Sequence, residues 1–144
     1  MNWRLIFVLS LLSFLMGIAS VLGLTKGSDW LMWLCVGVFC AWKFAGKTHD
    51  ELFLHGFYLG IFDGIFNSLV QAVFVSTYLS NNPGMVEALN SLPEGLHPAF
   101  VLLIMGPIIG VVSGIVFGLL AVIAGKLVRR RISEPPSSSI SRLL

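Results

Sequence analysis

The sequence contains few charged side chains. Nine Lys and Arg and seven Asp and Glu make up 11% of its 144 residues, whereas 56% of the residues are hydrophobic. The mean hydropathy is +0.91, and a soluble domain of this size needs a far more polar surface. The shortage of charge therefore excludes a soluble domain and predicts an integral membrane protein. It also excludes a nucleic-acid groove, because no basic surface alternates with aromatic side chains.

Cysteine is scarce and the usual catalytic motifs are absent. Cys35 and Cys40 are five residues apart in one expected helix and face different directions, so neither a disulfide nor a shared metal site follows. The chain lacks a His-Glu-x-x-His pair, a Gly-x-Ser-x-Gly elbow and a phosphate-binding glycine loop. Only one acidic residue lies inside an expected span, whereas an aspartyl protease mechanism needs two carboxyl groups. We therefore expect no enzymatic activity, no metal and no cofactor.

Long apolar runs, in contrast, dominate the chain. Four of them approach or exceed the roughly 20 helical residues that cross a hydrocarbon core of about 30 Å, at about residues 5–24, 30–45, 52–79 and 99–128. They predict an all-α fold in which residues 1–128 form one bundle of four transmembrane helices. The second run is short enough to suit a re-entrant segment instead. The first begins like a signal peptide, but it stays apolar through Leu24, which favours an uncleaved anchor.

Two local patterns lie between the runs. Thr48-His49-Asp50-Glu51 fits the capping box that starts a helix, so we expect the third helix to begin there. Asn82-Pro83-Gly84 is a turn pattern, and the apolar positions of residues 85–92 then fit one face of a short helix on the membrane surface.

The basic residues predict the orientation of the bundle. With four spans, every Lys and Arg except Lys26 lies on the same side of the membrane. The positive-inside rule then places both termini in the cytoplasm. Residues 129–144 form a basic stop-transfer flank followed by a Pro- and Ser-rich tail.

Small residues recur every four positions in the last two spans. The third span carries Gly56, Gly60 and Gly64, and the fourth carries Gly106, Gly110, Gly114 and Gly118. Such rows let helix backbones approach closely in lipid, so we expect these two helices to form a tight antiparallel hairpin. In the first span Ser10, Ser13, Gly17 and Ser20 recur at three and four, which also favours packing against a neighbouring helix.

The third span also carries a polar row of Asp63, Asn67 and Gln71 on one flank. A carboxyl group at a helix centre costs about 2.5 to 3.5 kcal/mol on insertion scales, so it is expected to be functional or tightly paired. One interpretation is a neutral acid that hydrogen-bonds Asn67, Ser113 or a backbone carbonyl. The other is a proton or cation site, with Asn67 and Gln71 extending a polar path outward and His55 as a relay toward the cytoplasm.

The second half resembles a known family. His55-Gly56-Phe57, the Gly- and Asp-containing helix, the Asn82-Pro83 turn and the glycine-rich span ending in Lys126 are similar to small four-helix bacterial membrane proteins of unknown function. The resemblance implies a multi-pass protein of the bacterial inner membrane. It assigns no residue a role.

Two functional hypotheses follow. The sequence contains no recognisable set of catalytic residues, which favours a non-catalytic accessory or assembly subunit. Such a subunit would pack its small-residue faces and Asp63 against a partner membrane protein or further copies of itself. The alternative is a small oligomeric transporter or channel in which Asp63 binds a proton or cation. Both place the chain in a lipid bilayer and neither involves nucleic acid.

Overall fold

The computed structural model describes every residue except 26, 49, 92–94 and 134–144. The described residues form six helices and no strand, which confirms the all-α prediction. The helices are α1 (Trp3–Val21), α2 (Asp29–Lys47), α3 (Leu52–Val73), α4 (Val75–Asn81), α5 (Pro83–Asn90) and α6 (Pro98–Ser133). Within the described ranges, three helices are long and apolar enough to cross a membrane: α1, α3 and the Pro98–Arg130 part of α6. The chain is therefore a helical membrane protein.

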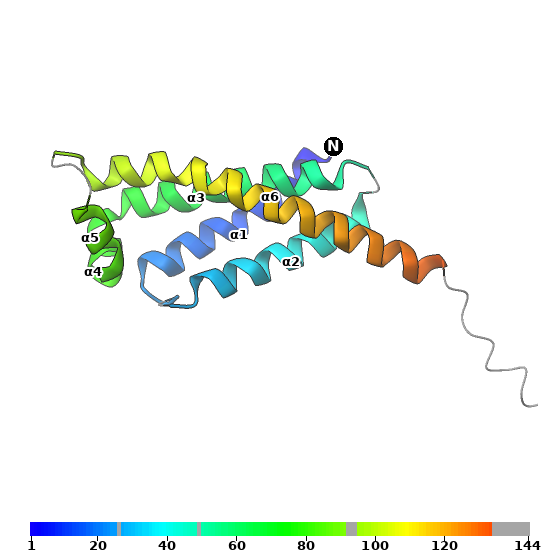
Figure 1. The fold of residues 1–144 in the computed structure, drawn as a ribbon, viewed down its shortest axis with the longest axis horizontal. Helices are drawn as coiled ribbons and strands as arrows, with labels where there is room; N and C mark the ends of the chain where they lie inside the picture. The colour runs from blue at the N-terminus through cyan, green and yellow to red at the C-terminus, as the bar shows by residue number, and fades with distance from the viewer. Residues whose placement is uncertain (26, 49, 92–94, 134–144) are drawn as a thin grey trace, which may run out of the picture.

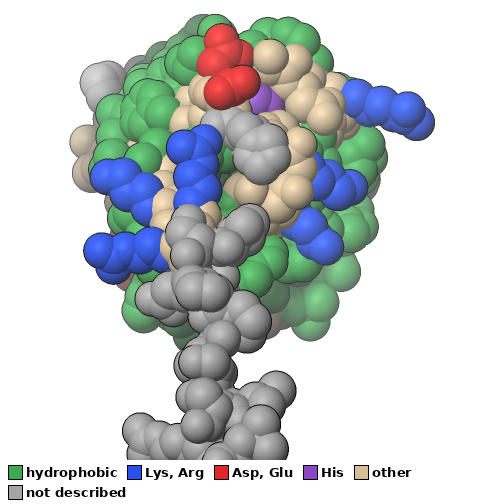
Figure 2. Space-filling view, turned by 90° about the vertical axis from the view of Figure 1, so that its right-hand side faces the viewer, with side chains coloured by type: hydrophobic (Ala, Val, Ile, Leu, Met, Phe, Trp, Pro, Cys, Tyr) green, Lys and Arg blue, Asp and Glu red, His purple; other side chains and the backbone are tan. Residues whose placement is uncertain are grey.

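Four helices, α1, α2, α3 and α6, run along the long axis of the molecule (Figure 1). The α1–α2 turn lies at one end with α4 and α5, and we call this the loop end. The other end holds the start of α1, the α2–α3 connection and the last turns of α6. Lys and Arg side chains surround that end in Figure 2, and we call it the basic end. Its described basic residues are Arg4, Lys43, Lys47, Lys126, Arg129 and Arg130.

Helices α3 and α6 meet backbone to backbone along their glycines. A Cβ atom added to Gly60 would overlap the backbone of Gly114, and one added to Gly64 would overlap the backbone of Gly106. Nearer the basic end, a Cβ at Gly56 would overlap the backbone of Phe117. The residue numbers rise in α3 as they fall in α6, so the two helices are antiparallel. Only glycine allows this approach, because any side chain would push the helices apart.

The first helix ends earlier than residue 24 because its last turn forms a Schellman motif. Gly23 has a φ of 69°, which favours glycine. Its N–H donates to the carbonyl of Ser20 at 3.0 Å, and that of Leu24 donates to the carbonyl of Ala19 at 3.0 Å. These two bonds satisfy carbonyls that the end of the helix would otherwise leave unpaired.

The region expected as one helix over residues 52–79 is two helices. The backbone leaves helical geometry at Phe74, with φ −105° and ψ 37°, and continues as α4. The side-chain amides of Asn81 and Asn82, at the end of α4, donate to the carbonyls of Val21 at 3.0 Å and Ser20 at 3.1 Å. These bonds hold α4 against the end of α1.

The other expected helix boundaries differ by a few residues. The Thr48 hydroxyl donates to the Phe44 carbonyl at 2.9 Å and so caps the end of α2, whereas the predicted capping box put it at the start of α3. Glu51 precedes α3 in a left-handed conformation, with φ 56° and no side-chain cap. The short helix expected at residues 85–92 is present as α5, and α6 continues to Ser133, past the expected end near residue 128.

Candidate functional site

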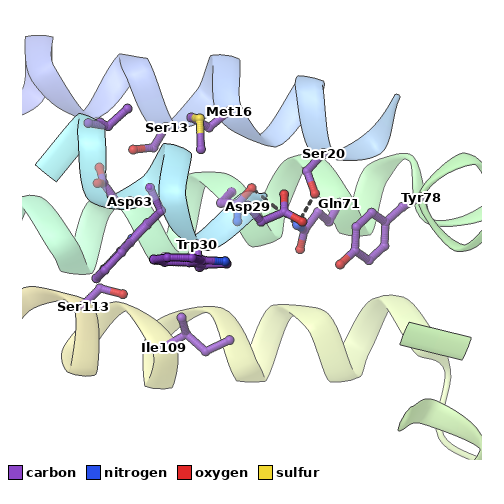
Figure 3. Close-up of a pocket in the computed structure, with 14 residues that line it drawn as sticks. Ser13, Met16, Ser20, Asp29, Trp30, Asp63, Gln71, Tyr78, Ile109 and Ser113 are labelled. Carbon is purple, nitrogen blue, oxygen red and sulfur yellow. Dashed lines mark hydrogen bonds between the residues drawn. The ribbon is translucent and has the colours of Figure 1, made fainter. Parts of the chain in front are cut away.

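A cavity of about 430 Å³ lies inside the bundle, between α1, α2, α3 and α6. Figure 3 shows it with the side chains that line it. Those side chains come from every long helix and from α4: Ser13, Met16, Ser20, Asp29, Trp30, Trp33, Val36, Asp63, Gly64, Asn67, Gln71, Tyr78, Ile109 and Ser113. Of the predicted polar residues, the structure thus brings Asp63, Asn67, Gln71 and Ser113 together around one space.

Asp63 lies at the deep end of this cavity. Its side chain is only 4% exposed, and its Oδ1 has no hydrogen-bond partner among the described residues. The Ser13 side chain of α1 points toward the carboxyl group, and Ser113 of α6 lies on another side of the space (Figure 3). A buried carboxyl oxygen without a partner is costly, so a group that enters the cavity and donates to it would be bound favourably.

Two amide side chains form the wall between α1 and α3. Nε2 of Gln71 donates to Oγ of Ser20 at 3.4 Å and to Oδ1 of Asn67 at 3.4 Å (Figure 3). Gly17 makes room for this wall, because a Cβ there would lie 3.1 Å from Oδ1 of Asn67. From Asp63 to Gln71 the polar row spans about 12 Å at 1.5 Å per residue. Polar groups therefore follow the cavity from its deep end toward the loop end.

Two exposed residues at the start of α2 line the part of the cavity that lies toward the loop end. Asp29 is exposed there, and Trp30 is 67% exposed at the start of α2. Tyr78 of α4, which lies outside the three candidate spans, is buried beside them. Burial, reinforced by the nearby Asp29 carboxylate, raises the pKa of the Tyr78 phenol. That phenol is therefore a neutral hydrogen-bonding group at physiological pH.

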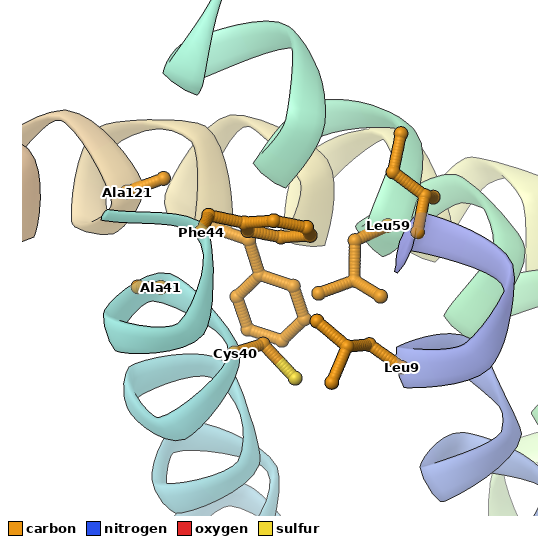
Figure 4. Close-up of a cluster of buried hydrophobic side chains, with 8 residues drawn as sticks. Leu9, Cys40, Ala41, Phe44, Leu59 and Ala121 are labelled. Atoms are coloured by element: carbon orange, nitrogen blue, oxygen red, sulfur yellow. The ribbon is translucent and has the colours of Figure 1, made fainter. Parts of the chain in front are cut away.

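A tightly packed apolar cluster closes the cavity toward the basic end. Its members include Leu9 of α1, Phe44 of α2 and Leu59 of α3, which converge in Figure 4. Phe117 of α6 completes it, and its ring stacks on Trp33 with centroids 4.5 Å apart. Phe44, Leu59 and Phe117 are each at most 1% exposed. The described side chains thus leave the Asp63 end of the cavity closed toward the basic residues.

His55 lies outside the cavity, in the direction of the basic end. Its Nε2 accepts a hydrogen bond from the backbone N–H of Asn2 at 2.8 Å. Because Nε2 is the acceptor, the neutral ring carries its proton on Nδ1, which lies 2.9 Å from the Glu51 carbonyl and donates to it. The ring therefore joins the start of α1 to the start of α3. Leu59, in the closed apolar cluster, lies one helical turn from each of His55 and Asp63.

Sequence reasoning missed several residues that line the cavity. Ser13 and Ser20 were assigned only to a packing face, although their spacing on the first span was recognised. Asp29, Trp30 and Tyr78 gave no signal, because each lies near the end of an expected span, where polar and aromatic residues are common. The predicted helix-packing glycines all lie where α3 and α6 meet, and Gly64 lines the cavity as well.

Comparison with protein-family models, curated proteins and solved structures finds no match for this chain. The resemblance of the second half to small four-helix bacterial membrane proteins therefore stays a prediction.

Proposed function

We propose that the protein is a small membrane transporter that receives a solute from the loop end and binds it at Asp63. The observation that carries this proposal is the Oδ1 atom of Asp63, which is buried and unpartnered at the deep end of a cavity of about 430 Å³. A carboxyl group that served only to pack helices would be expected to have its oxygens paired in a filled contact. The cavity therefore favours transport over the accessory-subunit hypothesis, which stays a prediction.

We further propose that four helices span the bilayer, with α2 as the fourth. At 19 residues α2 has the same length as α1 and lies alongside it, although Trp and Lys residues lower its hydropathy. The positive-inside rule then puts the basic end and both termini in the cytoplasm, and the cavity mouth on the outer face of a bacterial inner membrane.

The packing supports a transport cycle in which one face is closed at a time. The apolar cluster around Phe44 and Phe117 lies between the cavity and the basic end, whereas exposed Asp29 and Trp30 line the cavity toward the loop end. Delivery to the basic side requires that this cluster separates after the solute binds. Helices α3 and α6, which pack along their glycines, would form the rigid part, and α1 on α3 and α2 on α6 would be the parts that move.

Transport is tested with purified protein in liposomes, by recording capacitive currents after concentration jumps. Protons, sodium, potassium and tetramethylammonium would be applied in turn, with sucrose as an uncharged control. We expect a current from at least one cation in the wild type and none in Asp63→Asn. Glu87→Gln is the matched control, because it removes an exposed acid of α5 outside the cavity. An unchanged current in Asp63→Asn would contradict the role of Asp63.

The accessory-subunit hypothesis requires a different measurement. Extraction in native lipid particles, followed by sizing and mass spectrometry, would reveal a stoichiometric membrane partner. A monomer or homo-oligomer without a partner would contradict that hypothesis. Either result leaves the current measurement as the test of transport.

A further inference from the structure

We propose that the solute is a small monovalent organic cation, held with its ammonium group at Asp63 and its carbon skeleton against the aromatic side chains of the cavity. This inference rests on the transport function proposed above and names the class of ligand that fits the same site. Four properties of the cavity support it: charge, aromatic surface, size and polarity.

The charge of the cavity selects cations. In the part of the chain that the structure describes, its lining contains two carboxyl groups, from Asp29 toward the loop end and Asp63 at the deep end, and no Lys, Arg or His. The described basic side chains lie at the opposite end of the molecule, beyond the closed apolar cluster. Charges interact strongly in a space of low dielectric, so an anion would be repelled and a cation attracted.

The aromatic side chains select an organic cation. Trp30, Trp33 and Tyr78 all line the cavity, and aromatic faces attract ammonium groups, with Trp the strongest of the three. Trp33 is held in place by Phe117, since the two rings stack with an interplanar angle of 26°. A fixed indole pays little conformational entropy when a ligand binds against it.

The size of the cavity favours an organic ligand over a zinc, calcium or magnesium ion. Small-molecule sites generally enclose about 300 to 1,000 Å³, and a volume of about 430 Å³ falls in this range. A metal ion instead needs several ligand atoms at about 2.0 to 2.6 Å. Among the residues that the structure describes, no three His, Cys, Asp or Glu side chains converge in that way. Met16, Val36 and Ile109 add apolar surface suited to carbon.

The polar wall provides orientation rather than further charge. Asn67 and Ser113 also line the cavity near Asp63, and the partial negative charge of their oxygen atoms favours the positive headgroup of a ligand. The deep end offers one acidic side chain, which can balance one positive charge, so a monovalent cation is preferred there over a dication.

Binding is tested by isothermal titration calorimetry of the full chain in detergent with three matched probes. Benzyltrimethylammonium carries the positive charge, neopentylbenzene is its uncharged carbon isostere, and phenylmethanesulfonate is an anion of similar shape. We expect only the first to bind, with a loss of at least tenfold in Asp63→Asn and severalfold in Trp33→Leu. Glu87→Gln should bind it like the wild type. Equal binding of the cation and its isostere would overturn the proposal.

Accessibility separates this inference from the transport proposal. Asn67→Cys would be made in a Cys35→Ser, Cys40→Ser background and treated with a cationic and an anionic methanethiosulfonate. Ser80→Cys places a cysteine on the exposed side of α4, outside the cavity. The ratio of the cationic to the anionic reaction rate at this position is the intrinsic ratio of the two reagents. We expect the cationic reagent to be favoured at residue 67 at least tenfold beyond that ratio, with protection by benzyltrimethylammonium.

The failures differ in pattern. If neither reagent reaches residue 67, the cavity is not open to solutes and the transport proposal fails together with this inference. If both reagents react at the intrinsic ratio and benzyltrimethylammonium gives no protection, the cavity is accessible but does not select organic cations. That second result would overturn this inference alone.

Discussion

The backbone N–H of Asn2 donates a hydrogen bond of 2.8 Å to Nε2 of His55, which is 53 residues further along the chain. The opposite ring nitrogen of His55 bonds the carbonyl of Glu51 at 2.9 Å. One imidazole thus connects the beginnings of α1 and α3. Its two bonds give His55 a structural role, in contrast to the proton relay that its position in the sequence allowed.

Replacement of His55 should therefore affect stability and leave the cavity intact. His55→Ala removes both bonds and leaves a hole where a side chain only 1% exposed had been. We expect a loss of about 1 to 3 kcal/mol in the free energy of unfolding, measured by thermal denaturation in detergent. Binding of benzyltrimethylammonium should be unchanged in the folded fraction. A normal stability with abolished transport would instead support a relay.

The close contact between α3 and α6 predicts that alanine substitution lowers stability at a glycine in this contact and not at a glycine outside it. A Cβ at Gly60 overlaps the backbone of Gly114, so Gly60→Ala should destabilise the protein by about 1 to 3 kcal/mol through forced separation of the helices. Gly46 of α2 has nothing within 4 Å of an added Cβ. Gly46→Ala should therefore stabilise its helix by about 0.5 to 1 kcal/mol. Comparable unfolding temperatures for the two variants would contradict the close contact.

Replacement of the Asp63 carboxyl group should have opposite effects on stability and on function. The Oδ1 atom is buried without a partner among the described residues, so Asp63→Asn keeps the shape of the side chain while it replaces an acidic group that has one unpaired oxygen. We expect an unfolding temperature equal to or higher than that of the wild type, together with loss of cation binding. A strong destabilisation would mean that the carboxyl group holds the fold together, as the accessory-subunit hypothesis requires.

The mouth of the cavity depends on α4. Nδ2 of Asn82 donates to the carbonyls of Ser20 at 3.1 Å and Tyr78 at 2.8 Å. Asn82→Ala loses both bonds, and we expect about 1 to 3 kcal/mol less stability together with faster hydrogen exchange in residues 75–81. Ser80→Ala is the control, because its hydroxyl is exposed and bonds only the carbonyl of Thr77 within α4. Equal exchange in the two variants would show that Asn82 does not hold α4.

Some features of the fold could be read from local sequence and others could not. The spacing of Asp63, Asn67 and Gln71 places them on one flank of any helix, and the structure places all three on one cavity. The helix break at Phe74 has no such local sign, because neither Pro nor Gly lies there. Thr48 fits a capping pattern for α3, but its hydroxyl bonds the carbonyl of Phe44 and caps α2, while Glu51 precedes α3 in a left-handed conformation.

The sequence by itself determined that the chain is a helical membrane protein, because hydropathy and run length act locally along the chain. Close helix contacts were predictable for the same reason, since the glycines recur with the period of the helix. Only the tertiary structure decided that Ser13 of α1, Asp29 of α2 and Tyr78 of α4 join Asp63 around one space. Which flanks of separate helices face each other depends on how all of them pack at once, and no pattern within a single helix specifies that arrangement.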